Sequence, residues 1–526
     1  MNEYELIFDV KKKIEQEIRK HKLFLLKKEE AVFTVFEKFG VLFRIYFTDS
    51  NMQIQNHLRT KVKTNVTYID QTVFMQESLK WICRWIDEFC DDDKQSNQHE
   101  KVMADEIFDL MGQAYCYDQL DRMMKLHSAH YVRYQKLNNK IIFDYINSEV
   151  CDVHVAYDSI IKEAIAKEDI AVFKSKKYKS DEEMMDDIQS SDFSFEYNFQ
   201  FDGFCMDEYK IFAVELNKIA VEDMKAKNGI KLVIPGQEGI ISYPKQMWID
   251  IMHEKTGLTE MTVESIIDFF TYKHGKKSDL SLTYFMMDDT EKLMLSVGIF
   301  YMQRPAVNAL RVLAKGDKEQ RNSYNSQQNN LEQMQRRRFG CKLGSRYRIP
   351  VYLTREQEIR PGMDMLVYDP ENNYLQIIEL KYKLPIDSAQ DYVSLEELLN
   401  KAYRQLERSK EIVDENKKHL LEEYFGEEYK GIIPEKIDYF VLTNDSVGMG
   451  GDINLNLRLP TPIMLEKQYF ALMQYKNGME RVHDVLLDKN KGCITRIEKR
   501  YARLTFAGYK ILIPEYKYWN KSIYGE

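Results

Sequence analysis

The segment from residue 360 to residue 383, RPGMDMLVYDPENNYLQIIELKYK, restricts the fold of this chain more than any other stretch. Two largely apolar runs flank the residues DPENN, which are of the types that reverse the chain direction. We therefore predict a β-hairpin with strands over residues 363–369 and 374–383. Because side chains alternate between the two faces of a strand, Glu379 and Lys381 point to the same side of the second strand.

Three charged residues are expected to meet at one end of this hairpin. Asp364 opens the first strand, and pairing of the two strands brings it within reach of Glu379 and Lys381. Hard divalent cations such as Mg²⁺ bind carboxylate oxygens, backbone carbonyls and water. The candidate metal ligands are therefore the carboxylates of Asp364 and Glu379 and the carbonyl of Leu380, while Lys381 would position a metal-bound water or neutralise a phosphate.

The alternative explanation is an ordinary hairpin with a surface Glu–Lys pair, because such pairs are common. Other Glu-x-Lys triplets in the chain begin at Glu208, Glu415, Glu428 and Glu515. None of them follows an unbroken apolar strand whose partner strand opens on Asp. This context favours a functional site at the hairpin.

An Asp, an apolar hairpin and a (D/E)-x-K triplet resemble the signature of the PD-(D/E)xK nuclease superfamily. The resemblance covers residues 329–444 and departs from the motif in one respect, since Gly362 and Met363 precede the Asp where the motif has Pro. It implies a restriction-endonuclease-like α-β-β-β-α-β core. The chain offers these elements in order: a helix over 329–339, a strand over 347–353, the two hairpin strands, a helix over 392–413 and a strand over 436–443.

The resemblance also implies an activity, a cofactor and a set of site residues. Many members carry a Glu on the first helix near the metal, and Glu332 occupies that position. The implied enzyme is a metal-dependent endonuclease that uses Mg²⁺, or Mn²⁺ in its place, and acts on DNA rather than RNA. Its catalytic residues would be Lys381, Glu332, Asp364 and Glu379.

Candidate nucleic-acid contacts lie on the two helices of this segment. Arg336, Arg337 and Arg338 end the first helix, where they could hold phosphates beside the metal site. Cations also suit the negative end of a helix dipole, and that explanation stands equally. Lys401 and Gln405, on the later helix, could touch the site or the DNA.

The length of 526 residues predicts roughly three domains of about 150 residues each, and we expect an α+β multidomain protein. We predict a mainly helical region (1–180), a mixed α/β region (181–313), a nuclease-like domain (314–488) and a basic, aromatic tail (489–526). In the nuclease-like domain, residues 314–330 read as a mobile polar linker, and the Gly-rich loop at 447–452 reads as a flexible lid. The tail could track nucleic acid, or residues 504–513 could form a last strand packed on the core.

Several elements are expected in the mixed region. Period-two alternation predicts a strand over residues 193–201, and further strands are expected over 209–216 and 230–234. Two helices (245–255 and 262–272) and a hairpin (280–287 and 293–302) follow. This is the order of a winged-helix DNA reader, although the second helix has few basic residues, and an ordinary helical hairpin on a sheet is the alternative.

Composition narrows the setting in which the chain works. Seven scattered cysteines, no signal-like N-terminus and no clean apolar span predict a cytoplasmic protein without a membrane partner. The formal net charge of −9 counts against a general nucleic-acid binder, although an enzyme needs only a local basic track.

We therefore expect a nuclease, by analogy one that acts in antiviral defence against foreign DNA. The N-terminal half would serve as a sensor, a partner-binding module or a homo-oligomer contact. The rival hypothesis is a DNA-binding or scaffolding protein whose nuclease fold is catalytically degenerate.

Overall fold

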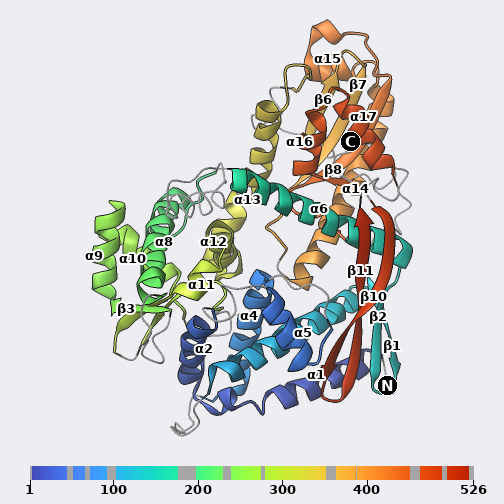
Figure 1. Ribbon diagram of the computed structural model, residues 1–526. Coiled ribbons are helices and arrows are strands. Elements are labelled where there is room, and N and C mark those ends of the chain that lie inside the picture. Colours follow the sequence, from blue (N-terminus) through green and yellow to red (C-terminus); the bar gives the residue numbers. More distant parts are fainter. Residues whose placement is uncertain are drawn as a thin grey trace.

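The computed structural model describes residues 3–43, 51–65, 71–91, 102–175, 197–228, 239–273, 279–288, 290–350, 363–386, 388–450, 463–488 and 494–520. These residues form helices and three small sheets, which confirms the expected α+β class (Figure 1). Among them, no helix is both long and apolar enough to cross a bilayer.

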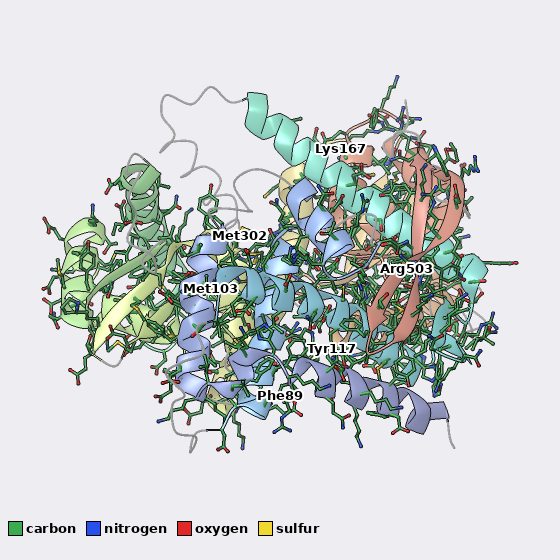
Figure 2. All side chains as sticks on the ribbon, turned by 60° about the horizontal axis from the view of Figure 1, so that its bottom comes forward. Phe89, Met103, Tyr117, Lys167, Met302 and Arg503 are labelled. Carbon is green, nitrogen blue, oxygen red and sulfur yellow. The ribbon has the colours of Figure 1, made fainter. Side chains whose placement is uncertain are left out.

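The N-terminal region is built mainly from helices. They are α1 (Glu3–Ile18), η1 (Lys22–Leu25), α2 (Lys28–Leu42), α3 (Asn51–Thr60), α4 (Gln71–Phe89), α5 (Ala104–Ser128) and α6 (Ser148–Ser175). Large side chains such as Phe36 and Trp85 are buried between α2, α4 and α5, as is Tyr117 (Figure 2). The expectation of a mainly helical region does not include one element, since β1 (Val132–Leu137) and β2 (Lys140–Tyr145) form a hairpin.

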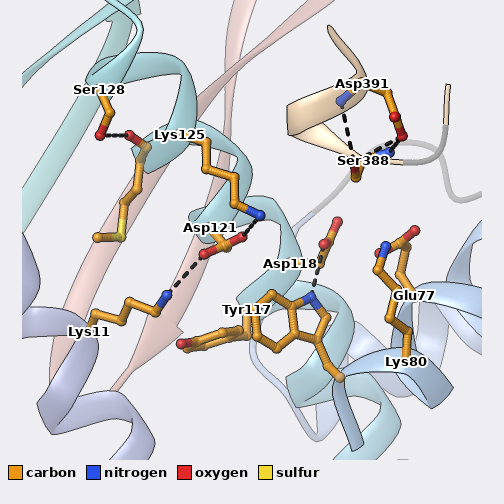
Figure 3. A network of polar contacts seen from close by, with 12 residues as sticks. Lys11, Glu77, Lys80, Tyr117, Asp118, Asp121, Lys125, Ser128, Ser388 and Asp391 are labelled. Carbon is orange, nitrogen blue, oxygen red and sulfur yellow. Dashed lines mark hydrogen bonds and ion pairs between the residues drawn. The ribbon is translucent and has the colours of Figure 1, made fainter. Parts of the chain in front are cut away.

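Ion pairs join the helices of this region. The carboxylate of Asp121 on α5 lies 3.0 Å from the Lys11 ammonium of α1 and 2.7 Å from that of Lys125 (Figure 3). Asp121 is nearly buried, so these two cations offset the cost of desolvating its charge. Beside them lies a cavity of about 840 Å³, which is also bordered by the starts of two helices of the nuclease-like segment, at Asp317 and Asp391.

The C-terminal residues complete the N-terminal sheet. β10 (Ile494–Phe506) and β11 (Tyr509–Asn520) form a long hairpin, and β11 pairs in parallel with β2, so the sheet order is β1-β2-β11-β10 (Figure 1). Leu504 and Ile511 are fully buried in the core of the N-terminal region. A separate tail domain over 489–526 is therefore wrong for the described residues.

The aromatic and basic residues of this hairpin bind acids of the N-terminal region. Tyr516 and Tyr518 donate to Asp152 and Glu163 of α6 at 2.5 and 2.9 Å. Lys499 lies 2.7 Å from the carboxylate of Asp144 on β2. Of the two interpretations of the tail, these contacts favour the packed strand.

The mixed region contains α8 (Met206–Asn228), β3 (Ile240–Pro244), α9 (Lys245–Thr256), α10 (Glu260–Phe269), β4 (Phe285–Met287), β5 (Lys292–Ser296) and α11 (Val297–Tyr301). Its antiparallel sheet has the order β3-β5-β4. The two helices and the hairpin are thus present, but the first hairpin strand begins only at Phe285 and the second ends early. Ser296 stops it, because its side chain caps α11 by accepting from the Ile299 amide.

Two strand predictions in this region are wrong. Residues 209–216 lie in α8, where Tyr209, Phe212, Ala213 and Leu216 are buried at helical spacing. Of residues 193–201, those up to 196 lie outside the described residues. From 197 onward there is only an isolated bridge between Gln200 and Cys205. The strand expected at 230–234 also lies outside the described residues.

Two helices lead into the nuclease-like segment, α12 (Pro305–Lys315) and α13 (Lys318–Lys342). The expectation of a mobile linker over 314–330 is wrong, because Asp317 and Gln320 form a capping box that starts α13. Further along, the Gln327 amide bonds to both backbone groups of Gln200 at 2.8 and 2.9 Å. The polar composition of this segment predicts a linker, but its helix is stabilised by a cap and by side-chain amide hydrogen bonds as well as by an apolar face.

The nuclease-like segment contains the third sheet, with the order β6-β7-β8-β9. Its strands are β6 (Met365–Asp369), β7 (Tyr374–Lys381), β8 (Lys436–Thr443) and β9 (Ile463–Leu465). β6 and β7 are antiparallel, whereas β7, β8 and β9 run parallel. Its helices and turns are α14 (Ala389–Asn416), α15 (Leu420–Phe425), η4 (Glu427–Tyr429), α16 (Glu466–Met473) and α17 (Gly478–Leu487).

The hairpin strands agree with the sequence prediction to within two residues at each end, and every residue of β6 and β7 is buried. Of the strand expected at 347–353, residues 351–353 lie outside the described residues. The rest contributes one antiparallel bridge, between Arg348 and Tyr368 of β6.

Candidate active site

The register of the β6–β7 hairpin brings the predicted site residues together. Met365 lies opposite Ile378, and continuing this register by one residue sets Asp364 opposite Glu379. Asp364 Oδ2 accepts a hydrogen bond from the Leu380 backbone amide at 2.9 Å. This bond fixes the carboxylate of Asp364 at the end of the hairpin where β7 finishes.

Lys381 lies between the two carboxylates. Its ammonium forms an ion pair with Glu379 Oε1 and lies 3.9 Å from Asp364 Oδ2. It also donates to the Leu380 carbonyl at 3.0 Å. Glu379 is fully buried, and Lys381 and Asp364 are only 7% and 8% exposed. Three charges therefore share a nearly dry space, where their interactions are strong.

The two oxygens of Glu379 have different surroundings. Oε2 is buried and has no hydrogen-bond partner within the described part of the chain. Burial, together with the negative charge of Asp364, raises the pKa of Glu379 to about 8, although the Lys381 ammonium opposes this shift. Burial alone would lower the pKa of Lys381, but the charges of Glu379 and Asp364 outweigh it and raise that pKa.

α13 contributes two further charges to the site. Glu332 is half-buried, and burial raises the pKa of its carboxyl, which also senses the charges of Lys381 and Asp364. One helical turn later, Arg336 Nη2 lies 3.5 Å from Asp364 Oδ1. The structure therefore places Glu332 and Arg336, two of the predicted site residues, on the face of α13 directed toward the hairpin.

The three consecutive arginines of α13 have different surroundings, because successive helical residues point about 100° apart. Arg337 is exposed, whereas Arg338 Nη1 lies 2.9 Å from Glu466 Oε1 at the start of α16. Glu466 is buried and also accepts from Gln335 Nε2 at 3.3 Å. This ion pair gives Arg338 a role in holding α16, which the sequence did not indicate because its partner is 128 residues away.

α14 lies beside β7 and carries the last two candidates. Lys401 is exposed, and its charge is felt by the Glu332 carboxyl. Gln405 is partly buried, and its Oε1 lacks a hydrogen-bond partner among the described residues. Both residues thus lie on the helix next to β7.

The donor set fits a hard divalent cation with few protein ligands. Among the described residues, no group of three or more His, Cys, Asp or Glu side chains gathers closely enough to hold a metal. Asp364 and Glu379 supply two carboxylates, and the Leu380 carbonyl is adjacent. Mg²⁺ is typically bound in this way, by one or two carboxylates with water completing its shell. The unpartnered Glu379 Oε2 is the atom that such a cation would satisfy.

The Gly-rich loop does not behave as the flexible lid that its composition predicts. Residues 446–449 are buried, and the backbone amide of Val447 and the hydroxyl of Ser446 donate to Asp158 Oδ1 of α6. Gly448 has φ +77°, and a Cβ there would lie 2.5 Å from Glu396 of α14. The described part of this loop therefore fastens two helices together, and 451–452 lie outside the described residues.

Comparison with protein-family models, with curated proteins and with solved structures finds no match to this chain. Its function must therefore be argued from the site itself.

Proposed function

We propose that this chain is a Mg²⁺-dependent nuclease that hydrolyses phosphodiester bonds, in DNA rather than RNA, and that Mn²⁺ can replace Mg²⁺. The observation that carries the proposal is the meeting of Asp364, Glu379 and Lys381 at one end of a buried hairpin, with one Glu379 oxygen left unpartnered. A buried carboxylate pair with a displaced pKa is costly to maintain, so it favours a functional explanation over a surface ion pair.

The order of elements supports the proposal. α13, β6, β7, α14 and β8 follow one another as helix, strand, strand, helix, strand, and the isolated Arg348 bridge stands where the expected core has its first strand. The sheet neighbours also follow this order, from the bridge through β6 and β7 to β8. This succession agrees with the α-β-β-β-α-β core expected from the resemblance to PD-(D/E)xK nucleases.

In the proposed mechanism, Asp364 and Glu379 would hold the metal, and the Leu380 carbonyl would be a third donor. A bound Mg²⁺ supplies Lewis acidity toward the phosphate and lowers the pKa of water. Lys381 stays protonated because both carboxylates raise its pKa, so it acts as a cation that orients water and stabilises negative charge on the phosphate. Glu332, whose pKa is raised by burial, is suited to receive a proton from water.

Arg336 and Lys401 are the proposed contacts to the nucleic-acid backbone, since both charges act on carboxyl groups at the same end of the hairpin. Arg338 is less suited to this role because Glu466 already holds it.

The rival function, a DNA-binding or scaffolding protein, draws support from the mixed region. Its elements α8, β3, α9, α10, β4 and β5, with the sheet order β3-β5-β4, have the arrangement of a winged helix. However, α10 has no Lys or Arg and exposes Glu260, Glu264 and Asp268. These carboxylates would repel phosphates in a DNA groove, so this unit is poorly suited to reading DNA.

The deciding experiment incubates the purified full chain and MgCl₂ with DNA and with RNA of the same sequence. We expect Mg²⁺-dependent cleavage of DNA, reduced about a hundredfold or more by Lys381→Ala. Lys430→Ala is the matched control, because that lysine is 67% exposed on the surface of the same segment. Equal cutting by Lys381→Ala protein that is folded by circular dichroism would refute the assignment, and Mg²⁺-independent DNA binding without cleavage would favour the rival.

A further inference from the structure

Arg336 contacts Asp364, one of the two proposed metal-binding carboxylates, and the proposed reaction does not require this contact. Its guanidinium lies 3.5 Å from Asp364 Oδ1, and both side chains are only 12% exposed. The other oxygen of Asp364 is engaged by the Leu380 amide. Oδ1 is therefore the oxygen of Asp364 that an incoming cation would use, and Arg336 already contacts it.

The contact between Arg336 and Asp364 is a weak one for this residue pair. Strong arginine–carboxylate pairs are bidentate, with N···O distances of about 2.7–2.9 Å. Here a single nitrogen reaches the oxygen at the outer limit of hydrogen bonding, and the Arg336 Nε is buried with no partner within the described residues. The guanidinium is therefore held in the site mainly by charge and can leave at modest cost.

The local charges show what would make it leave. Two cations, Arg336 and Lys381, already face the carboxyl groups of Asp364, Glu379 and Glu332 without a metal. A divalent cation adds two positive charges and takes the same oxygen. Lys381 donates to Glu379 and to the Leu380 carbonyl, whereas Arg336 makes one long hydrogen bond within the described residues, to Asp364, and is otherwise attracted by the charge of Glu332 one helical turn away. Arg336 is thus the cation that repulsion displaces.

We propose that Arg336 is an exchangeable counter-ion of the metal site. It neutralises Asp364 while no metal is bound, and metal binding expels its guanidinium toward the nucleic-acid phosphates. This inference rests on the proposed metal site and deepens it, because it assigns Arg336 a regulatory role. It follows that metal and nucleic acid favour each other's binding. Metal binding releases Arg336 from Asp364 to contact phosphates, and phosphates that bind Arg336 leave the Asp364 oxygen open to the metal.

The test measures Mn²⁺ binding to the full chain without nucleic acid, by the electron paramagnetic resonance signal of free Mn²⁺. Arg336→Gln removes the competing cation and is expected to bind Mn²⁺ about tenfold more tightly than the wild type. Arg336→Lys retains a competing charge and should bind Mn²⁺ nearly as the wild type does. Arg337→Gln, the same charge change on the neighbouring exposed residue, should also leave the affinity unchanged.

Each result decides the matter. Wild-type or weaker Mn²⁺ affinity in Arg336→Gln, when Asp364→Asn abolishes binding, overturns the counter-ion role but leaves the metal site intact. An equal gain in Arg336→Gln and Arg337→Gln also overturns it, because the effect would then be one of overall charge. Undiminished binding by Asp364→Asn overturns the metal site itself, and with it the proposed function.

Discussion

At the scale of single residues, Glu379 links the buried charges to the stability of the protein. Its pKa is raised to about 8 by burial and by Asp364, whereas its ordinary value is 4.5. The folded state therefore retains a proton that the unfolded chain releases between these values. Because the folded pKa is the higher one, the stability that this carboxyl contributes is complete below pH 4.5 and is lost as the pH rises toward 8.

We expect the Tm of the metal-free protein to decline between pH 5 and pH 8, and Glu379→Gln to flatten that decline because the amide does not titrate. Thermal melts followed by circular dichroism in chelator-treated buffer measure both slopes. Glu423→Gln, a change at a glutamate of α15 away from the acid pair, is the control. An unchanged slope in Glu379→Gln would show that this residue is not the titrating group.

Metal removal gives a related prediction. A metal that binds Glu379 displaces its proton, so metal binding tightens as the pH rises. At a fixed Mg²⁺ concentration, we expect the Tm increase caused by Mg²⁺ to be larger at pH 8.5 than at pH 6. Differential scanning fluorimetry with and without chelator measures the increase. A pH-independent increase would mean that Mg²⁺ binds elsewhere or that Glu379 is already ionised.

The residues that could be predicted from sequence are those whose placement depends on local geometry. The turn and the strand pleat fix Asp364, Glu379 and Lys381 relative to one another, and the structure brings these three together. The contact of Arg338 with Glu466 could not be predicted, because it depends on how α13 and α16 pack.

At the scale of elements, the Arg338–Glu466 pair fastens α13 to α16. Arg338→Ala would leave the carboxylate of Glu466 buried without its ion-pair partner, so we expect a loss of about 3 kcal/mol in the free energy of unfolding. Arg337→Ala, on the exposed side of the same helix, should change it by less than about 0.5 kcal/mol. Urea unfolding of both variants measures the difference, and equal midpoints would argue against the pair as a fastening.

The accuracy of the sequence predictions varied among elements for a physical reason. The β6–β7 hairpin was found because its turn residues and its apolar runs favour the same structure. Residues 209–216 were assigned to a strand because apolar residues there satisfy either period over a short window, and only packing selects the helix α8. The hairpin β1–β2 was missed because it lies between long helices and its strands have six residues each.

At the scale of the whole molecule, the C-terminal hairpin and the β1–β2 hairpin of the N-terminal region form one sheet. β11 pairs in parallel with β2, and the β10–β11 hairpin covers α5 and α6 (Figure 1). Such a pairing between distant segments has no local signature, which is why the C-terminal residues were interpreted as a separate tail. It also means that the nuclease-like segment lies in sequence between two parts of a single folded unit, so truncation at either end of the chain disturbs the same core.

Two neighbouring positions on β10 test this arrangement. Leu504 is fully buried, whereas the side chain of Arg503 is exposed (Figure 2). Leu504→Asp places an unpaired carboxylate in the core of the N-terminal region, and we expect the Tm of that region to fall by roughly 10 °C. Arg503→Asp reverses a surface charge, and its backbone bonds to Asn65 do not depend on the side chain, so little change is expected.

Melting of the N-terminal region is followed by the fluorescence of Trp81 and Trp85, which lie in its core, in a background that replaces the other two tryptophans, Trp248 and Trp519, by Phe. If the hairpin completes this core, Leu504→Asp shifts the tryptophan transition and Arg503→Asp does not. Equal transitions in the two variants would mean that the C-terminal hairpin does not pair with the edge of β2. In that case a protein shortened before β10 should keep an intact N-terminal region, whereas the buried contacts of Leu504 and Ile511 require that it lose stability.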